Sequence, residues 1–93
     1  MATHYVIISD DHLFIPHYLE ICEGDTVIWK NASKSTHSIT ANDKMFDFTN
    51  VKPDDIVKYK FIKDGIFFYD CKNHVGMGGT VTVSHYFINM RPE

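Results

Sequence analysis

The sequence of 93 residues contains no long apolar run. A transmembrane helix needs about 20 consecutive apolar residues, so we expect no membrane span. Basic residues are not in excess either: nine Lys and Arg stand against twelve Asp and Glu, which gives a formal net charge of −3. The lysines are scattered along the chain rather than gathered into a stripe. This balance argues against a nucleic-acid partner.

Cysteine is also scarce, with Cys22 and Cys71 far apart in the sequence. Iron–sulfur clusters need more thiolates than two, and we expect both cysteines to be unpaired. Cys22 is interpreted as a small residue on a strand edge rather than as a redox, linking or metal-capturing residue. Residues 1–4 lack the basic start of a signal peptide. We expect a cytosolic protein, or a periplasmic or otherwise extracytoplasmic one if a signal peptide has been removed.

No amphipathic helix longer than a turn or two is evident. Short runs in which apolar and polar residues alternate recur along the chain, separated by Gly, Pro, Asn and Asp. This pattern predicts an all-β, two-sheet sandwich of about seven or eight strands. The length of the chain predicts one domain over residues 1–93, in which residues 84–93 form a possible C-terminal extension. The expected strands cover residues 5–9, 16–22, 27–30, 38–41, 57–61, 67–71 and 81–83.

The alternation also predicts which side chains face the core. Trp29 is expected inside, and so are Phe67, Tyr69 and Cys71, because side chains two residues apart share one face of a strand. The segment 42–53 is too apolar for a free loop, and we expect an irregular or briefly helical connection there. A turn is expected at Gly78-Gly79, where glycine gives the backbone freedom to reverse.

Cys71, His74 and Met77 follow one another at intervals of three residues, directly after the predicted buried strand. A thiolate, an imidazole and a thioether are ligands for an electron-transfer copper site, provided that a second histidine joins them. His37 is the best candidate for that histidine, because it follows the strand of Trp29 and a turn and then begins another strand. The other histidines of the chain, His4, His12, His17 and His85, lack that context. Zinc is the principal competitor, but structural zinc sites rarely include Met.

With these residues in view, the sequence resembles the blue (type 1) copper proteins of the cupredoxin family, and in particular plastocyanin and amicyanin. The two residues between His74 and Met77 match the shorter spacing of amicyanin. The resemblance covers nearly the whole chain. It is carried by Phe14-Ile15-Pro16, Gly24-Asp25-Thr26-Val27, Trp29, Asn31, His37-Ser38, Gly65-Ile66-Phe67-Phe68-Tyr69, Cys71, His74, Met77 and Gly79.

This resemblance implies a Greek-key β-sandwich that holds one type 1 copper per chain and shuttles single electrons by cycling between Cu(I) and Cu(II). It implies a carrier rather than an enzyme, with transient protein redox partners, and we expect a monomer. It further implies that the electron leaves through the exposed edge of His74. The expected rim around that edge consists of Val75, Gly76, Gly78, His12 and Pro16.

Two points separate this chain from the family's pattern. Many members have Asn after the first ligand histidine, where this chain has Ser38. Ser38 is thus a candidate contact residue behind the ligands, and the family's hydrogen bond between the ligand segments does not transfer to it directly. The additional histidines and Cys22 support an alternative function, a copper-binding module for copper resistance or delivery.

Overall fold

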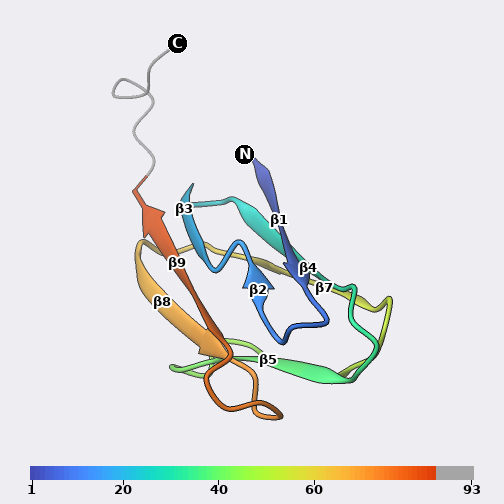
Figure 1. Ribbon diagram of the computed structural model, residues 1–93. Coiled ribbons are helices and arrows are strands. Elements are labelled where there is room, and N and C mark those ends of the chain that lie inside the picture. Colours follow the sequence, from blue (N-terminus) through green and yellow to red (C-terminus); the bar gives the residue numbers. More distant parts are fainter. Residues whose placement is uncertain (86–93) are drawn as a thin grey trace.

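The computed structural model describes residues 1–85, and within this part of the chain it contains nine strands and no helix. Figure 1 shows their arrangement. The predicted extension over 84–93 lies, beyond His85, outside the described residues. The strands are β1 (Thr3–Ile8), β2 (Phe14–Ile15), β3 (Tyr18–Cys22), β4 (Thr26–Asn31), β5 (His37–Ala41), β6 (Asp47–Val51), β7 (Ile56–Lys60), β8 (Gly65–Asp70) and β9 (Gly78–Ser84).

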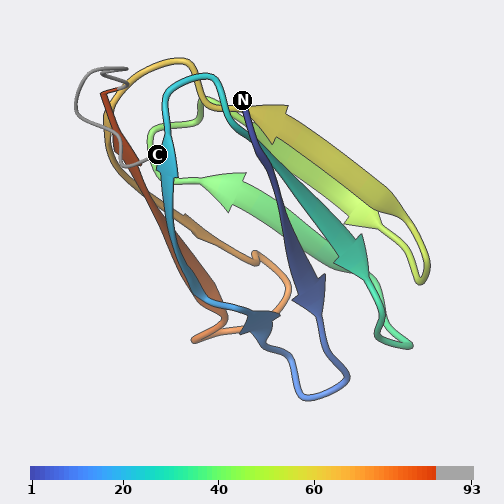
Figure 2. The same ribbon diagram turned by 90° about the horizontal axis from the view of Figure 1, so that it is seen from above.

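The strands form two sheets, one in the order β2-β1-β4-β7 and one in the order β3-β9-β8-β5-β6. Figure 2 shows the two layers from above. β1 pairs with β4 in parallel, and β3 pairs with β9 in parallel; the remaining pairs are antiparallel. The predicted all-β sandwich is therefore confirmed. No helix within residues 1–85 has the length and hydropathy of a membrane span.

The core between the sheets follows the predicted alternation. Trp29 is fully buried, and Tyr69 and Cys71 are buried while the residues on either side of Tyr69 are more exposed. The apolar area removed from water by such side chains is the main stabilising contribution to a domain of this size. The largest fully buried side chains also include Phe61, Ile8 and Ile39.

Two sequence predictions were wrong in detail. The segment 42–53 contains the strand β6, which pairs with β5 across an irregular register between His37 and Ile39. Its exposure does not alternate regularly, so the period of two that marks a strand is missing from the sequence. The turn expected at Gly78-Gly79 occurs earlier: Gly76 has a φ of 82°, while Gly78 and Gly79 lie in β9.

Three connections meet at one end of the sandwich, the lower end in Figure 1. They join β1 to β2, β4 to β5 and β8 to β9. The backbone N–H of Lys34, in the β4–β5 connection, donates to the Asp10 carboxylate of the β1–β2 connection at 2.9 Å. All the metal-ligand candidates lie at this end.

Candidate metal centre

Cys71 is placed by the strand that precedes it. β8 directs Tyr69 into the core, and the same alternation makes Cys71 only 5% exposed. Its backbone N–H donates to the carbonyl of Met77 at 3.0 Å, which closes the loop of residues 71–77. We call this segment the ligand loop. The thiol of Cys71 therefore lies at the boundary between the core and the end of the sandwich.

The two histidines approach this sulfur from different segments. His37 is the first residue of β5 and is fully buried, whereas His74 lies in the ligand loop and is partly exposed. The Nδ1 atom of each lies 3.6 Å from the Sγ atom of Cys71. Their ring centroids are 4.5 Å apart. Two imidazole nitrogens thus converge on one sulfur.

These distances fit a metal centre. A metal ion that bonds sulfur at about 2.3 Å and nitrogen at about 2.0 Å, with about 110 to 120° between the bonds, holds the two atoms about 3.5 to 3.7 Å apart. Both sulfur–nitrogen distances lie in this range. As hydrogen bonds to a thiol they are long and weak. The arrangement is therefore better suited to a bridging ion than to a pair of hydrogen bonds.

The protonation state of His37 suits the same role. Burial, together with the neighbouring imidazoles of His74 and His12, lowers the pKa of His37. A neutral ring keeps the lone pair that a metal requires. Its other nitrogen, Nε2, lies 3.2 Å from the hydroxyl of Ser35, which holds the ring in place.

The connection before His37 is held by a buried amide. Asn31 is fully buried and donates through Nδ2 to the carbonyls of Ser35, at 2.8 Å, and Val51, at 2.9 Å. Its Oδ1 accepts from the backbone N–H and the hydroxyl of Ser33, at 2.9 and 2.6 Å. An amide whose donors and acceptor are all satisfied fixes one conformation of its surroundings. Asn31 thereby orders the segment that presents His37.

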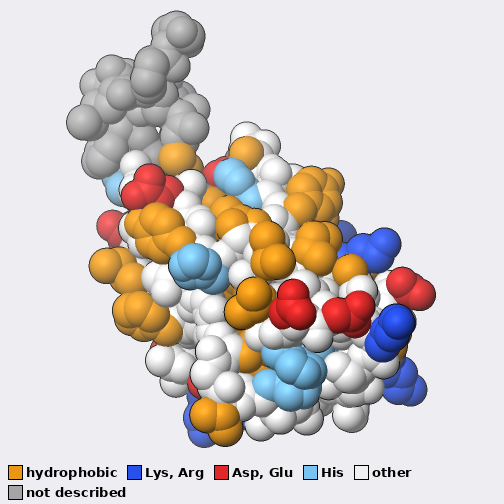
Figure 3. Space-filling view, viewed as in Figure 1, with side chains coloured by type: hydrophobic (Ala, Val, Ile, Leu, Met, Phe, Trp, Pro, Cys, Tyr) orange, Lys and Arg blue, Asp and Glu red, His pale blue; other side chains and the backbone are white. Residues whose placement is uncertain are grey.

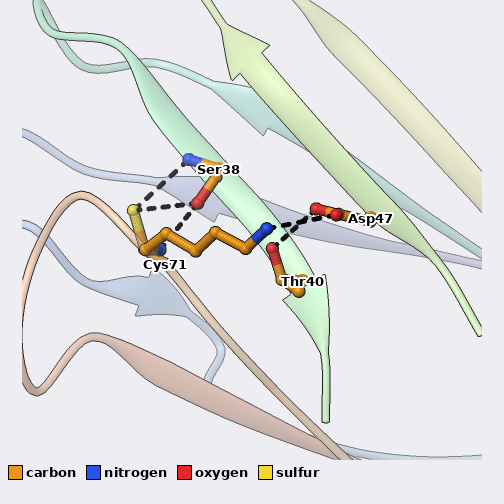
Figure 4. A network of polar contacts seen from close by, with 5 residues as sticks. Ser38, Thr40, Asp47 and Cys71 are labelled. Atoms are coloured by element: carbon orange, nitrogen blue, oxygen red, sulfur yellow. Dashed lines mark hydrogen bonds and ion pairs between the residues drawn. The ribbon is translucent and has the colours of Figure 1, made fainter. Parts of the chain in front are cut away.

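Ser38 contacts both ligand segments, as Figure 4 shows. Its backbone N–H donates to Cys71 Sγ at 3.3 Å, and its hydroxyl lies 3.8 Å from the same sulfur. The hydroxyl also accepts from the backbone N–H of Lys72 at 2.7 Å. The serine that departs from the family's Asn therefore joins β5 to the ligand loop directly.

Lys72 extends this connection to the neighbouring strand. Its Nζ atom lies 3.1 Å from the Asp47 carboxylate in β6, and the hydroxyl of Thr40 donates to the other carboxylate oxygen at 2.9 Å. The hydrogen bond from Thr40 and, to a smaller extent, the one from Lys72 lower the pKa of Asp47. Because the pair is largely exposed, its contribution to stability is small. Its effect is to restrain the start of the ligand loop.

Met77, the fourth predicted ligand, is only 3% exposed. It lines one hollow together with Cys71 and His74. The chain can return into β9 beside this site because residue 79 is glycine. A Cβ atom on Gly79 would overlap the ring of Tyr69, so a larger residue there would force this buried ring, two residues before Cys71, to move.

The structure also brings together the residues predicted to surround His74. Val75 is fully exposed, and Val75, Gly76 and Gly78 line the same hollow as His74. Pro16 lines an adjacent groove with Gly76 and Gly78. In Figure 3, histidine side chains gather on the surface near this lower end of the molecule. The rim is mainly uncharged, and its role in docking stays a prediction.

His12, predicted as a rim residue, contacts the rings of both candidate histidine ligands. Its ring stacks on that of His74 with a centroid distance of 4.0 Å and an interplanar angle of 24°. It lies 5.5 Å from the ring of His37. One ring nitrogen from each of the three histidines lies within 4.8 Å of the others.

Sequence reasoning missed the roles of Asn31, Ser35 and the Lys72–Asp47 pair. The segment between the strand of Trp29 and His37 is predicted from the sequence only as a turn. A buried asparagine at the end of an apolar strand is a signal for such a network, because its amide needs several partners. The Lys72–Asp47 pair has no comparable local signal.

Several solved structures are similar to this chain. A purple cupredoxin from Nitrosopumilus maritimus is 28% identical, with a TM-score of 0.82 over 87% of this chain and 99% of that one. The Cu(I) form of an amicyanin variant is 24% identical, with a TM-score of 0.80 over 88% of this chain and 82% of that one. A reduced Cu(I) form of another amicyanin variant at pH 4 is also 24% identical, with a TM-score of 0.79 and the same coverage. No protein-family model and no curated protein matches the sequence.

These similarities agree with the geometry of the site. The four candidate ligands occupy the end of a two-sheet sandwich, and two of them, His74 and Met77, share a short loop with Cys71. The chain thus has the cupredoxin fold, with a purple cupredoxin and amicyanins as structural neighbours and a His–Cys–His–Met cluster that resembles a type 1 copper site.

Proposed function

We propose that the chain binds one copper ion through His37, Cys71, His74 and Met77 and carries single electrons between protein redox partners. The observation that carries this proposal is the convergence of the two Nδ1 atoms, each 3.6 Å from Cys71 Sγ. Thiolate and thioether suit Cu(I), while imidazole also suits Cu(II). A bound copper would supply the one-electron change. The amicyanin structures that resemble this chain include Cu(I) forms, which supports the choice of metal.

The residues around the ligands supply rigidity. His37 and Cys71 are buried, and Ser35, Ser38 and Asn31 hold their segments by hydrogen bonds. A site held in this way changes little when the charge on the metal changes, which lowers the cost of transferring an electron. The N–H of Ser38 that points at Cys71 Sγ also stabilises a thiolate.

The shape of the site favours a carrier over an enzyme. His74 is the partly exposed ligand, and Val75, Gly76 and Gly78 form an uncharged part of the hollow around it, which Asp70 and Lys72 also line. A small apolar surface suits brief contact with another protein, since weak complexes separate quickly. We propose that electrons pass through the His74 edge to such partners.

Electron self-exchange tests this proposal most directly. Mixtures of Cu(I) and Cu(II) protein are examined by NMR line broadening, with Cys71→Ser as the control that lacks the thiolate. The proposal predicts fast self-exchange and slow transfer of copper to a metal-free acceptor protein. Slow self-exchange with rapid loss of copper to the acceptor would instead identify a copper-delivery module.

A further inference from the structure

The two candidate histidine ligands are held very differently. His37 has its second ring nitrogen 3.2 Å from the hydroxyl of Ser35. For His74, which is partly exposed, no protein group within residues 1–85 is hydrogen-bonded to Nε2, and Nδ1 lies 3.6 Å from Cys71 Sγ. A histidine that binds a metal nearly always has its other nitrogen bonded to a partner that orients the ring. Because no protein group orients the His74 ring in this way, its packing contacts are the restraint that the chain itself can provide.

The ligand loop itself provides little restraint on this ring. Two long backbone hydrogen bonds flank His74. Its N–H donates to the Cys71 carbonyl at 3.4 Å, and its carbonyl accepts from the Met77 N–H at 3.4 Å. The next residue, Val75, is fully exposed, and Gly76 has the positive φ of 82°. The two rings that contact the imidazole of His74, those of His12 and His37, come from outside this loop.

The closest ring to His74 is that of His12, from the β1–β2 connection. The centroids are 4.0 Å apart and the planes differ by 24°, a face-to-face contact between two flat rings. Because the planes are nearly parallel, the in-plane lone pairs of His12 and His74 do not converge on one ion. The contact is thus a stack rather than a pair of ligands.

The side chain of His12 is exposed, and its backbone is ordered by the β1–β2 connection. Its φ is 60°, in the left-handed region that residues other than glycine adopt infrequently. Its N–H donates to the Ser9 carbonyl at 3.1 Å, and the N–H of Ser9 donates to the Leu13 carbonyl at 3.0 Å. The adjacent Asp10 accepts from Lys34 N–H. A strained backbone persists where its surroundings determine it, and such positions cluster at functional sites.

We propose that His12 is a positioning residue for His74: the stacked ring of His12 keeps the ligand imidazole in one orientation. This inference rests on the proposed function, because it takes His74 to be a copper ligand. It assigns the flat face of His12, rather than its nitrogen atoms, as the active feature. A ring of similar shape without nitrogen should therefore serve as well.

The test compares His12→Ala, which removes the ring, with His12→Phe, which keeps a flat ring without nitrogen. His17→Ala, at another exposed histidine, is the control. Two readouts are used: electron paramagnetic resonance of the Cu(II) protein, and the NMR line widths of the His74 ring in the metal-free protein. We expect His12→Ala to broaden both and to slow self-exchange several-fold, while His12→Phe and His17→Ala resemble the unmodified protein.

Two results would overturn the proposal. If His12→Ala leaves both readouts unchanged, the stack does not position His74. If His12→Phe fails in the same way as His12→Ala, a nitrogen of His12 is required, as a ligand or as a hydrogen-bonding group. If the unmodified protein binds no copper, the proposed function fails, whereas the line widths of the metal-free His74 ring still report whether His12 restrains it.

Discussion

The backbone N–H of Ser38 donates a hydrogen bond to the Sγ atom of Cys71 at 3.3 Å, although the two residues are 33 positions apart in the sequence. The hydroxyl of the same serine accepts from the N–H of Lys72 at 2.7 Å. One residue of β5 is therefore bonded to the candidate thiolate and to the backbone that follows it. The two ligand segments are connected by protein atoms alone, which gives the site its shape independently of the metal.

Replacing Ser38 tests this connection. Ser38→Ala keeps the N–H that points at the sulfur but removes the hydroxyl, so the Lys72 N–H loses its acceptor. We expect the free energy of unfolding of the metal-free protein to fall by about 1–2 kcal/mol, as measured by urea denaturation. Ser38→Thr retains a hydroxyl and should recover much of the loss. Equal stability of Ser38→Ala and the unmodified protein would contradict a bonding role for the hydroxyl.

Ser35 is predicted to affect metal affinity. Its hydroxyl lies 3.2 Å from His37 Nε2 and fixes the orientation of a buried ring. Loss of such a partner typically weakens metal binding by about 10- to 100-fold. We expect Ser35→Ala to show a decrease of this order in a competition titration with a chromophoric Cu(I) chelator. Ser35→Thr, which retains the hydroxyl, is the control, and an unchanged affinity in Ser35→Ala would count against the contact.

Met77 is predicted to set the reduction potential. Met77→Gln replaces a soft thioether with a harder amide oxygen, which favours Cu(II) over Cu(I). Voltammetry should therefore show a lower potential in Met77→Gln than in the unmodified protein. Met45→Gln changes a methionine outside the ligand loop and should leave the potential where it was. No difference between the potentials would remove Met77 from the site.

Asp25 makes the stability of the domain depend on pH at the end opposite to the metal centre. Burial raises the pKa of Asp25, but the Ala2 N–H, the His4 ring and the Cys22 N–H bond to the carboxylate and outweigh it, so the pKa lies below 3.8. An acid whose pKa is lowered by folding stabilises the fold above its unfolded pKa, and this contribution is lost as the pH falls through the folded pKa.

The expected result is a free energy of unfolding of the metal-free protein that falls as the pH is lowered from about 5 toward 3. Asp25→Asn cannot titrate, so its free energy of unfolding should change less over the same range. Urea denaturation at a series of pH values measures both slopes. Identical slopes for the two proteins would show that Asp25 does not account for the loss.

The sequence predicts those parts of the structure that depend on local periodicity. Cys71 lies inward because side chains alternate strictly along β8, and its spacing to His74 and Met77 is a local property of one loop. Trp29 is buried for the same reason in β4. Such features can be read from a few neighbouring residues, and they include three of the four candidate ligands.

Other features depend on which distant segments meet. β6 was missed because Asp47 and Asn50 have poor strand propensity and because its pairing with β5 is irregular. The hydrogen bonds of Ser38 to Cys71 and of Lys72 to Asp47 join residues 33 and 25 positions apart. The sequence contains no periodicity that would report such contacts.

The central claim is that His37, Cys71 and His74 hold a type 1 copper, and the visible absorption spectrum tests it most directly. Cu(II) is added stepwise to the metal-free protein and to Cys71→Ser. The claim predicts an intense band of thiolate-to-copper charge transfer that saturates at one copper per chain and is absent from Cys71→Ser. A colourless protein, or a band that survives the loss of the Cys71 thiolate, would contradict it.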